Sequence, residues 1–110
     1  MKTSGVILVI FLFLFFVSAL SAGEQGEELF KSKGCTLCHK QEGTSGSFPS
    51  LSEIAMAYKG KQKQLIQYLN GEADPIVKPE SAGTMKRQIE KTKAMSDSDR
   101  TALADFMLSP

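Results

Sequence analysis

The five residues Cys35-Thr36-Leu37-Cys38-His39 decide how the rest of this 110-residue chain is interpreted. Cys-x-x-Cys-His is the spacing at which a polypeptide attaches haem covalently. Each thiol can add to one of the two vinyl groups of a haem, and the adjacent imidazole then lies under the iron as an axial ligand. The motif therefore predicts one haem c per chain, attached through Cys35 and Cys38 and ligated by His39.

The two cysteines allow two other interpretations besides haem attachment. The chain has two cysteines and one histidine, all within five residues, so a zinc site would lack a fourth good ligand. A thioredoxin-like dithiol would need a βαβ context and would leave His39 unexplained. A Cys-x-x-Cys disulfide oxidoreductase therefore stays only as an alternative to haem attachment.

The N-terminus predicts export. A lysine precedes a wholly apolar run over residues 6–17, and small residues follow as far as Gly23, which is the layout of a secretory signal peptide. We expect cleavage after Ala22, which divides the chain into a signal peptide (1–22) and one domain (23–110). The run is shorter than the roughly twenty residues of a membrane span. Its extension to Ala22 leaves an uncleaved membrane anchor as the alternative to release into the periplasm.

The expected mature domain is small and has no net charge. The full chain carries 13 Lys+Arg and 12 Asp+Glu, and one of the basic residues, Lys2, belongs to the signal. This balance gives no indication of nucleic-acid binding. A domain of this size buries little of its own surface and usually needs a stabilising cofactor or cross-link. We therefore expect the mature chain to be largely unfolded without haem.

The mature part predicts helices joined by polar loops, without an alternating strand pattern or a repeat. Glycine stops are expected after three early helices, which cover residues 24–33, 51–58 and 65–69. A last helix is expected after Ser96, which begins a capping-box sequence that ends at Asp99. Leu103, Phe106 and Met107 would form the inner face of this helix.

Four features follow one another along residues 23–110. A first helix runs into the haem motif, Pro49-Ser50-Leu51 follows a polar loop, a methionine lies well downstream, and Ser96-Asp97-Ser98-Asp99 opens the last helix. This order resembles that of the small bacterial class I cytochromes c. The resemblance implies an all-α class I fold, in which several short helices surround one haem and the N- and C-terminal helices cross. It places four residues at that crossing: Gly26, Phe30, Leu103 and Phe106.

The same resemblance implies the residues that contact the haem. The carbonyl of Pro49 matches one that accepts a hydrogen bond from Nδ1–H of the proximal histidine, which orients the ring and raises its basicity. One departure is Phe48, which stands where glycine usually precedes this proline. Candidate partners for the haem propionates are Tyr58 and Lys61. The apolar residues expected to line the haem are Leu51, Ile54, Tyr58, Leu65, Ile76 and Ile89.

The second axial ligand is expected to be a methionine. His39 is the sole histidine, so bis-histidine ligation is impossible and methionine, lysine, water or an open site remain. A thioether gives the raised potential of His/Met cytochromes. Of the five methionines, the first belongs to the signal, and Met56 and Met107 lie in expected helices as core or surface residues. The remaining two are Met85 and Met95.

Met85 is the predicted ligand and Met95 is the alternative. Met95 directly precedes the cap at Ser96, where an apolar residue commonly packs back on the helix that it introduces. Met85 begins a stretch without glycine or proline and shares a helix face with Ile89, so a sulfur and an apolar partner can both face the haem. One layout among related families places the ligand well upstream of the Ser-Asp pair, which favours Met85. A rival layout places the methionine close to the final helix and would favour Met95.

An iron with both axial positions filled by protein has no open site for substrate, so we expect an electron carrier and not an enzyme. The predicted function is that of a soluble periplasmic cytochrome that shuttles single electrons between respiratory partners. A membrane quinol:cytochrome c oxidoreductase or another donor would reduce it, and a terminal oxidase or reductase would accept the electron. We expect transient contacts and a monomer. The alternative is a haem-based ligand sensor or small peroxidase with a labile sixth ligand.

Basic residues accompany both haem-binding segments. Lys31, Lys33 and Lys40 flank the attachment motif, and Lys86, Arg87, Lys91 and Lys93 follow Met85. A run of charges is ordinarily a solvated face. The alternative is a basic ring around the exposed haem edge, which would steer transient docking to acidic redox partners.

Overall fold

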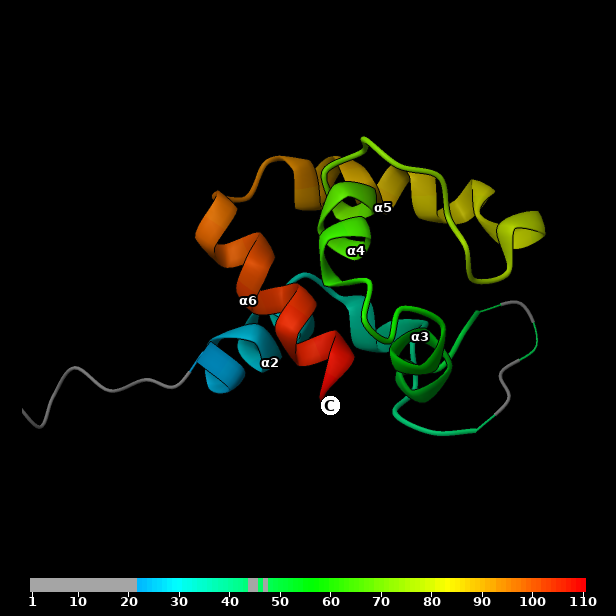
Figure 1. Ribbon diagram of the computed structural model, residues 1–110, viewed down its shortest axis with the longest axis horizontal. Coiled ribbons are helices and arrows are strands. Elements are labelled where there is room, and N and C mark those ends of the chain that lie inside the picture. The colour runs from blue at the N-terminus through cyan, green and yellow to red at the C-terminus, as the bar shows by residue number, and fades with distance from the viewer. Residues whose placement is uncertain (1–21, 44–45, 47) are drawn as a thin grey trace, which may run out of the picture.

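The computed structural model describes residues 22–43, 46 and 48–110, and this part of the chain consists of helices and loops without a β-strand (Figure 1). The predicted all-α class is therefore confirmed. The expected signal peptide lies outside the described residues, apart from its last residue, Ala22. Two short 3-10 helices are present, η1 (Cys35–Leu37) and η2 (Pro79–Ser81). The α-helices are α2 (Ala22–Ser32), α3 (Leu51–Ala57), α4 (Gln62–Leu69), α5 (Gly83–Lys93) and α6 (Asp97–Leu108).

The helices begin and end within a few residues of the predicted positions, which is the usual spread for helix ends. Glycine follows α2, α3 and α4 as expected, at Gly34, Gly60 and Gly71, each with a positive φ. The capping box predicted at the start of α6 forms only in part. Ser96 Oγ accepts from the backbone N–H of Asp99 (3.1 Å), but the Asp99 carboxylate accepts from Gln25 Nε2 (2.6 Å). A complete capping box is present at α3 instead.

Helices α2 and α6 cross in close contact, which confirms the predicted pairing of the two ends of the domain (Figure 1). A Cβ atom added at Gly26 would lie 2.7 Å from Cβ of Phe106 and closer still to the carbonyl oxygen of Ala102. Glycine is therefore required for the helices to approach this closely. Phe30 and Phe106 pack with ring centroids 5.4 Å apart, and Phe30 and Leu103 are fully buried.

Helix α6 is the centre of the fold, because it also contacts α3 and α4. Helix α5 contacts α4 and η2. Arg100 of α6 is 4% exposed, and its guanidinium donates to the carbonyls of Thr92 (3.0 Å), Lys93 (3.0 Å) and Met95 (2.7 Å). The Thr92 hydroxyl in turn donates to the carbonyl of Leu69 in α4. The C-terminal end of α5 is thus tied to both α4 and α6.

Within the part of the chain that the structure describes, no helix is both long enough and apolar enough to cross a membrane.

Candidate haem-binding site

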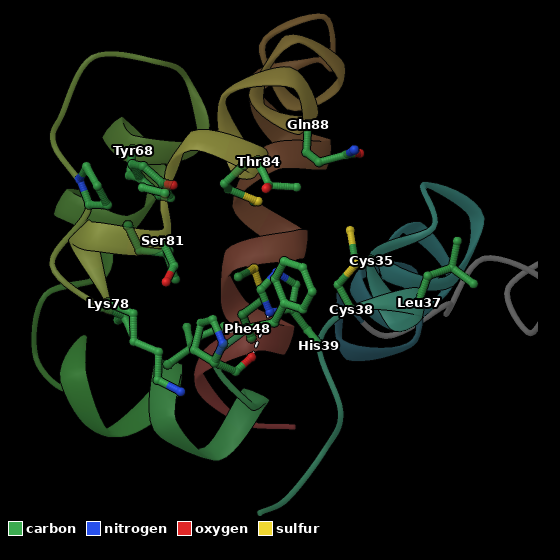
Figure 2. Close-up of a pocket in the computed structure, with 18 of the residues that line it drawn as sticks. Cys35, Leu37, Cys38, His39, Phe48, Tyr68, Lys78, Ser81, Thr84 and Gln88 are labelled. Atoms are coloured by element: carbon green, nitrogen blue, oxygen red, sulfur yellow. Dashed lines mark hydrogen bonds between the residues drawn. The ribbon is translucent and has the colours of Figure 1, made fainter. Parts of the chain in front are cut away.

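The Cys-x-x-Cys-His motif folds into one compact turn directly after α2. Gly34 has φ 77° and ψ 15°, a left-handed conformation that suits glycine, and it turns the chain into η1. The carbonyl of Cys35 then accepts from the backbone N–H groups of Cys38 (3.3 Å) and His39 (2.9 Å). This turn brings the two thiols and the imidazole to one side of a single cavity (Figure 2).

The cavity lies between this turn, helices α3 and α4, and helix α5. It holds about 1040 Å³ of empty space, part of which is open to solvent. Its apolar walls include Ile54, Leu65, Val77 and Met107. The lining of the cavity is therefore apolar enough for a macrocycle such as haem.

His39 is fixed in orientation by the backbone. Its Nδ1 atom lies 2.7 Å from the carbonyl oxygen of Pro49, as the dashed line in Figure 2 shows. A carbonyl oxygen can only accept a hydrogen bond, so Nδ1 carries the proton and Nε2 has a free lone pair for a metal. The structure thus contains the hydrogen bond that the resemblance implied for Pro49, and Phe48 before the proline does not prevent it.

Helix α5 forms the wall across the cavity from His39. Figure 2 shows Thr84 and Gln88 of this helix on the far side from His39 and Phe48. Met85, from the same turn of the helix as Thr84, also lines the cavity. Met95 lies beyond the end of α5, where it is half-buried against the hydrophobic core and outside the cavity lining.

The predicted haem contacts fall into two groups. Pro49, Ile54, Tyr58 and Leu65 line the cavity. Three further residues lie outside its lining, each for a local reason. Leu51 packs into the core at the start of α3, and Ile89 lies on the stripe of α5 that joins the same core. Ile76 is 36% exposed, whereas Val77, the next residue, lines the cavity.

Sequence reasoning also missed several residues that line the cavity. Helical spacing from Met85 could have found Gln88, because residues three apart share a helix face. Lys91, a further three residues on, is a candidate for the basic ring, and it lines the cavity as well. Met107, which the sequence predicts as a core or surface residue, is both buried and part of the lining. The same spacing from Leu65 could have found Tyr68, whereas no local pattern indicated Val77 or Lys78.

Two tyrosines contribute polar groups to the cavity. The hydroxyl of Tyr58 is buried and makes no hydrogen bond of ordinary geometry with the described residues. Burial raises the pKa of Tyr58, and the nearby backbone amide of Ile76 lowers it in part. Burial, followed by the proximity of Tyr58, raises the pKa of Tyr68 to about 12. A neutral hydroxyl with an unused proton fits a cofactor that carries carboxylates, as haem does.

Lys61, the other candidate for a propionate, precedes α4 as its N-cap residue, is exposed and lies outside the cavity lining. The two thiols are free of any disulfide. Burial raises the pKa of Cys35, and the positive charge of Lys91 opposes that effect. The donor set at the cavity, two thiols beside an oriented imidazole, fits covalent attachment of haem.

The family model for cytochrome c matches residues 23–110. The chain belongs to the cytochrome c family. It is also similar to cytochrome c-551 of Azotobacter vinelandii, with 29% identity over 89 residues, which cover 78% of this chain and 98% of the relative. These comparisons and the all-helical fold identify a small class I monohaem cytochrome c, with one haem c attached covalently. The cytochrome is an electron carrier.

Proposed function

We propose that this cytochrome c carries single electrons on a haem whose iron is ligated by His39 and Met85. One observation supports the assignment most strongly: Met85 lines the same cavity as Cys35, Cys38 and His39, whereas Met95 lies outside it. When bound, the haem supplies one-electron redox chemistry. The chain supplies attachment, axial ligands and a largely apolar surrounding.

The two proposed ligands act on the iron in opposite senses. The hydrogen bond from His39 Nδ1–H to Pro49 (2.7 Å) fixes the ring and raises its basicity. The soft thioether of Met85 raises the reduction potential. With both axial positions filled, a substrate has no site on the iron, so the chain transfers electrons without binding a substrate there.

The proposed setting is the periplasm, with a quinol:cytochrome c oxidoreductase or another donor and a terminal oxidase or reductase as acceptor. Encounters of this kind are small and transient. Lys31 is paired with Glu27 (3.0 Å) and Lys93 with Glu90 (3.8 Å), so these two cations are partly neutralised. A docking surface around the haem would therefore draw its positive charge from other exposed residues, which include Lys33, Lys40, Lys86 and Arg87.

Carbon monoxide binding to the reduced holoprotein tests this proposal against a ligand sensor or small peroxidase. The wild type is expected to bind the gas slowly, because Met85 must leave the iron first. Met85→Ala is expected to bind it rapidly, and Met95→Ala, the matched control, is expected to behave as the wild type does. Rapid binding by the wild type would favour the sensor or the peroxidase.

A further inference from the structure

We propose that Glu53 and Lys78 form a positioning pair that tunes His39 through the peptide group between Pro49 and Ser50. The pair is not part of the attachment motif, and Glu53 does not line the cavity. The inference rests on the proposed ligation of iron by His39. It assigns to Glu53 and Lys78 a control over the basicity of that ligand.

The connection runs across one peptide unit. Its carbonyl oxygen, from Pro49, accepts the hydrogen bond from His39 Nδ1 (2.7 Å). Its N–H, from Ser50, donates to Oε2 of Glu53 (3.2 Å). Both groups belong to the same planar, conjugated unit, and Ser50 is 0% exposed. Glu53 and His39 are thus joined by two hydrogen bonds and one peptide bond.

Hydrogen bonds at the two ends of a peptide group strengthen each other. An anionic acceptor on the N–H side polarises the unit and increases the negative charge on its carbonyl oxygen. That oxygen then accepts more strongly from Nδ1–H of His39, which makes the imidazole a more basic ligand. A more basic ligand stabilises oxidised iron. The carboxylate of Glu53 is therefore expected to lower the reduction potential.

Lys78 acts on the same carboxylate oxygen. Its Nζ lies 3.4 Å from Oε2 of Glu53, the atom that accepts from Ser50, and also donates to the carbonyl of Gly46 (3.0 Å). The Glu53 and Lys78 side chains are each 26% exposed, so solvent screens the pair only in part. The cation withdraws charge from the carboxylate and weakens its effect on the peptide unit.

The backbone of Lys78 supports a specific role for this residue. Its φ of 44° and ψ of 58° place it in the left-handed region, which non-glycine residues rarely adopt. Among the residues that the structure describes, Lys78 is the only non-glycine residue with a positive φ. Such conformations persist where the surroundings hold them. In Figure 2, Lys78 runs along the edge of the cavity towards the segment that holds Phe48.

Two substitutions are expected to shift the potential of the holoprotein in opposite directions. Glu53→Gln keeps an oxygen that can accept from Ser50 N–H, but it removes the charge, so the potential should rise. Lys78→Met leaves the carboxylate unopposed, so the potential should fall. Glu90→Gln is the matched control, because it also removes one acid from an ion pair but has no contact with the Pro49–Ser50 peptide unit.

The potentials are to be measured at about 1 M salt, where the Debye length of about 3 Å suppresses direct charge effects. Nuclear magnetic resonance of the reduced holoproteins provides the second measurement, the exchange rate of the His39 Nδ1 proton with solvent. This exchange is expected to be about threefold faster in Glu53→Gln and slower in Lys78→Met, since cooperative polarisation changes the strength of this bond by a modest fraction.

Potentials and exchange rates that match the Glu90→Gln control in both variants would overturn the proposal, as would shifts of the same sign. The wild-type spectrum separates this failure from failure of the proposed ligation. If His39 ligates the iron, its ring protons show a large haem ring-current shift in all variants. Absence of that shift would contradict the proposed ligation by His39 and, with it, the role inferred for Glu53 and Lys78.

Discussion

The two walls of the haem cavity are held in different ways. On the wall of His39, the imidazole is bonded to Pro49, and α3 begins with a complete capping box between Ser50 and Glu53. On the opposite wall, α5 is tied at its C-terminal end by Arg100. No side-chain hydrogen bond among the described residues caps the N-terminal end of α5, where Met85 lies.

This difference indicates which of the two proposed axial ligands leaves the iron more easily. Local opening starts where backbone hydrogen bonds are exposed and contacts are few. The N-terminal half of α5 meets that description, because residues 83, 86 and 87 are exposed and lie outside the cavity lining. We therefore expect the contact of Met85 with the iron to be lost at lower denaturant concentration than that of His39.

The largest expected effect comes from removing the haem, because both walls face the cavity that it fills. A chain of this size has little other core to stabilise it. The haem-free mature chain is expected to be largely unfolded, and circular dichroism during heating measures this directly. Cooperative melting of a haem-free preparation with full helical content would show that the chain folds without the cofactor.

Arg100→Ala is expected to have the next largest effect and to act first on the wall of Met85. It leaves three carbonyls at the end of α5 without their donor, at a cost of about 3 kcal/mol in the free energy of unfolding. Denaturant titration followed by the Met-to-iron absorption band and by circular dichroism separates loss of the ligand from global unfolding. We expect the band to disappear first.

Asp97→Asn is the control for Arg100, since it removes only the fully exposed partner of the same guanidinium (2.8 Å). It should leave both transitions nearly unchanged. Equal effects of the two substitutions would place the stabilisation in the ion pair and not in the α5 carbonyls.

Gly26→Ala is expected to have a smaller effect, on the wall of His39. The added Cβ collides with Ala102 and Phe106, and overpacking of this kind costs about 2 kcal/mol. Phe30, which lies next to Phe106 with its ring centroid 6.5 Å from that of His39, transmits the displacement. Global stability, measured by urea unfolding of the holoprotein, should fall.

Gly83→Ala is the matched control for Gly26, because nothing lies within 4 Å of a Cβ added at this position in α5. The same substitution should stabilise here by about 0.5 kcal/mol, through the better helix propensity of alanine. A loss of stability at Gly83, or none at Gly26, would contradict the difference in packing between the two walls.

The crossing of α2 and α6 could be predicted because the resemblance to small class I cytochromes c implies it. The spacing agrees with that expectation, since Gly26 and Phe30 lie four residues apart on one face and Leu103 and Phe106 lie on the inner face of the last helix. The haem-attachment turn could be predicted from neighbouring residues alone, because its five residues specify attachment without reference to the rest of the fold.

The missed contacts depend on neighbours distant in sequence. Arginine is ordinarily a surface residue. Arg100 is buried only because carbonyls from the end of α5 accept hydrogen bonds from its guanidinium. Glu53 and Lys78 meet across 25 positions of sequence. Periodicity marked Ile54 and Ile89 as buried, but it does not say which buried surface each faces. Ile54 lines the cavity and Ile89 joins the core beside it.

The absorption spectrum of the oxidised holoprotein tests the central claim most directly, since the proposed electron carrier depends on Met85 as the second axial ligand. The Met-to-iron band is to be recorded for the wild type, Met85→Ala and Met95→Ala. We predict that the band survives the loss of Met95 and vanishes with the loss of Met85. A band that survives in Met85→Ala and vanishes in Met95→Ala would contradict the account.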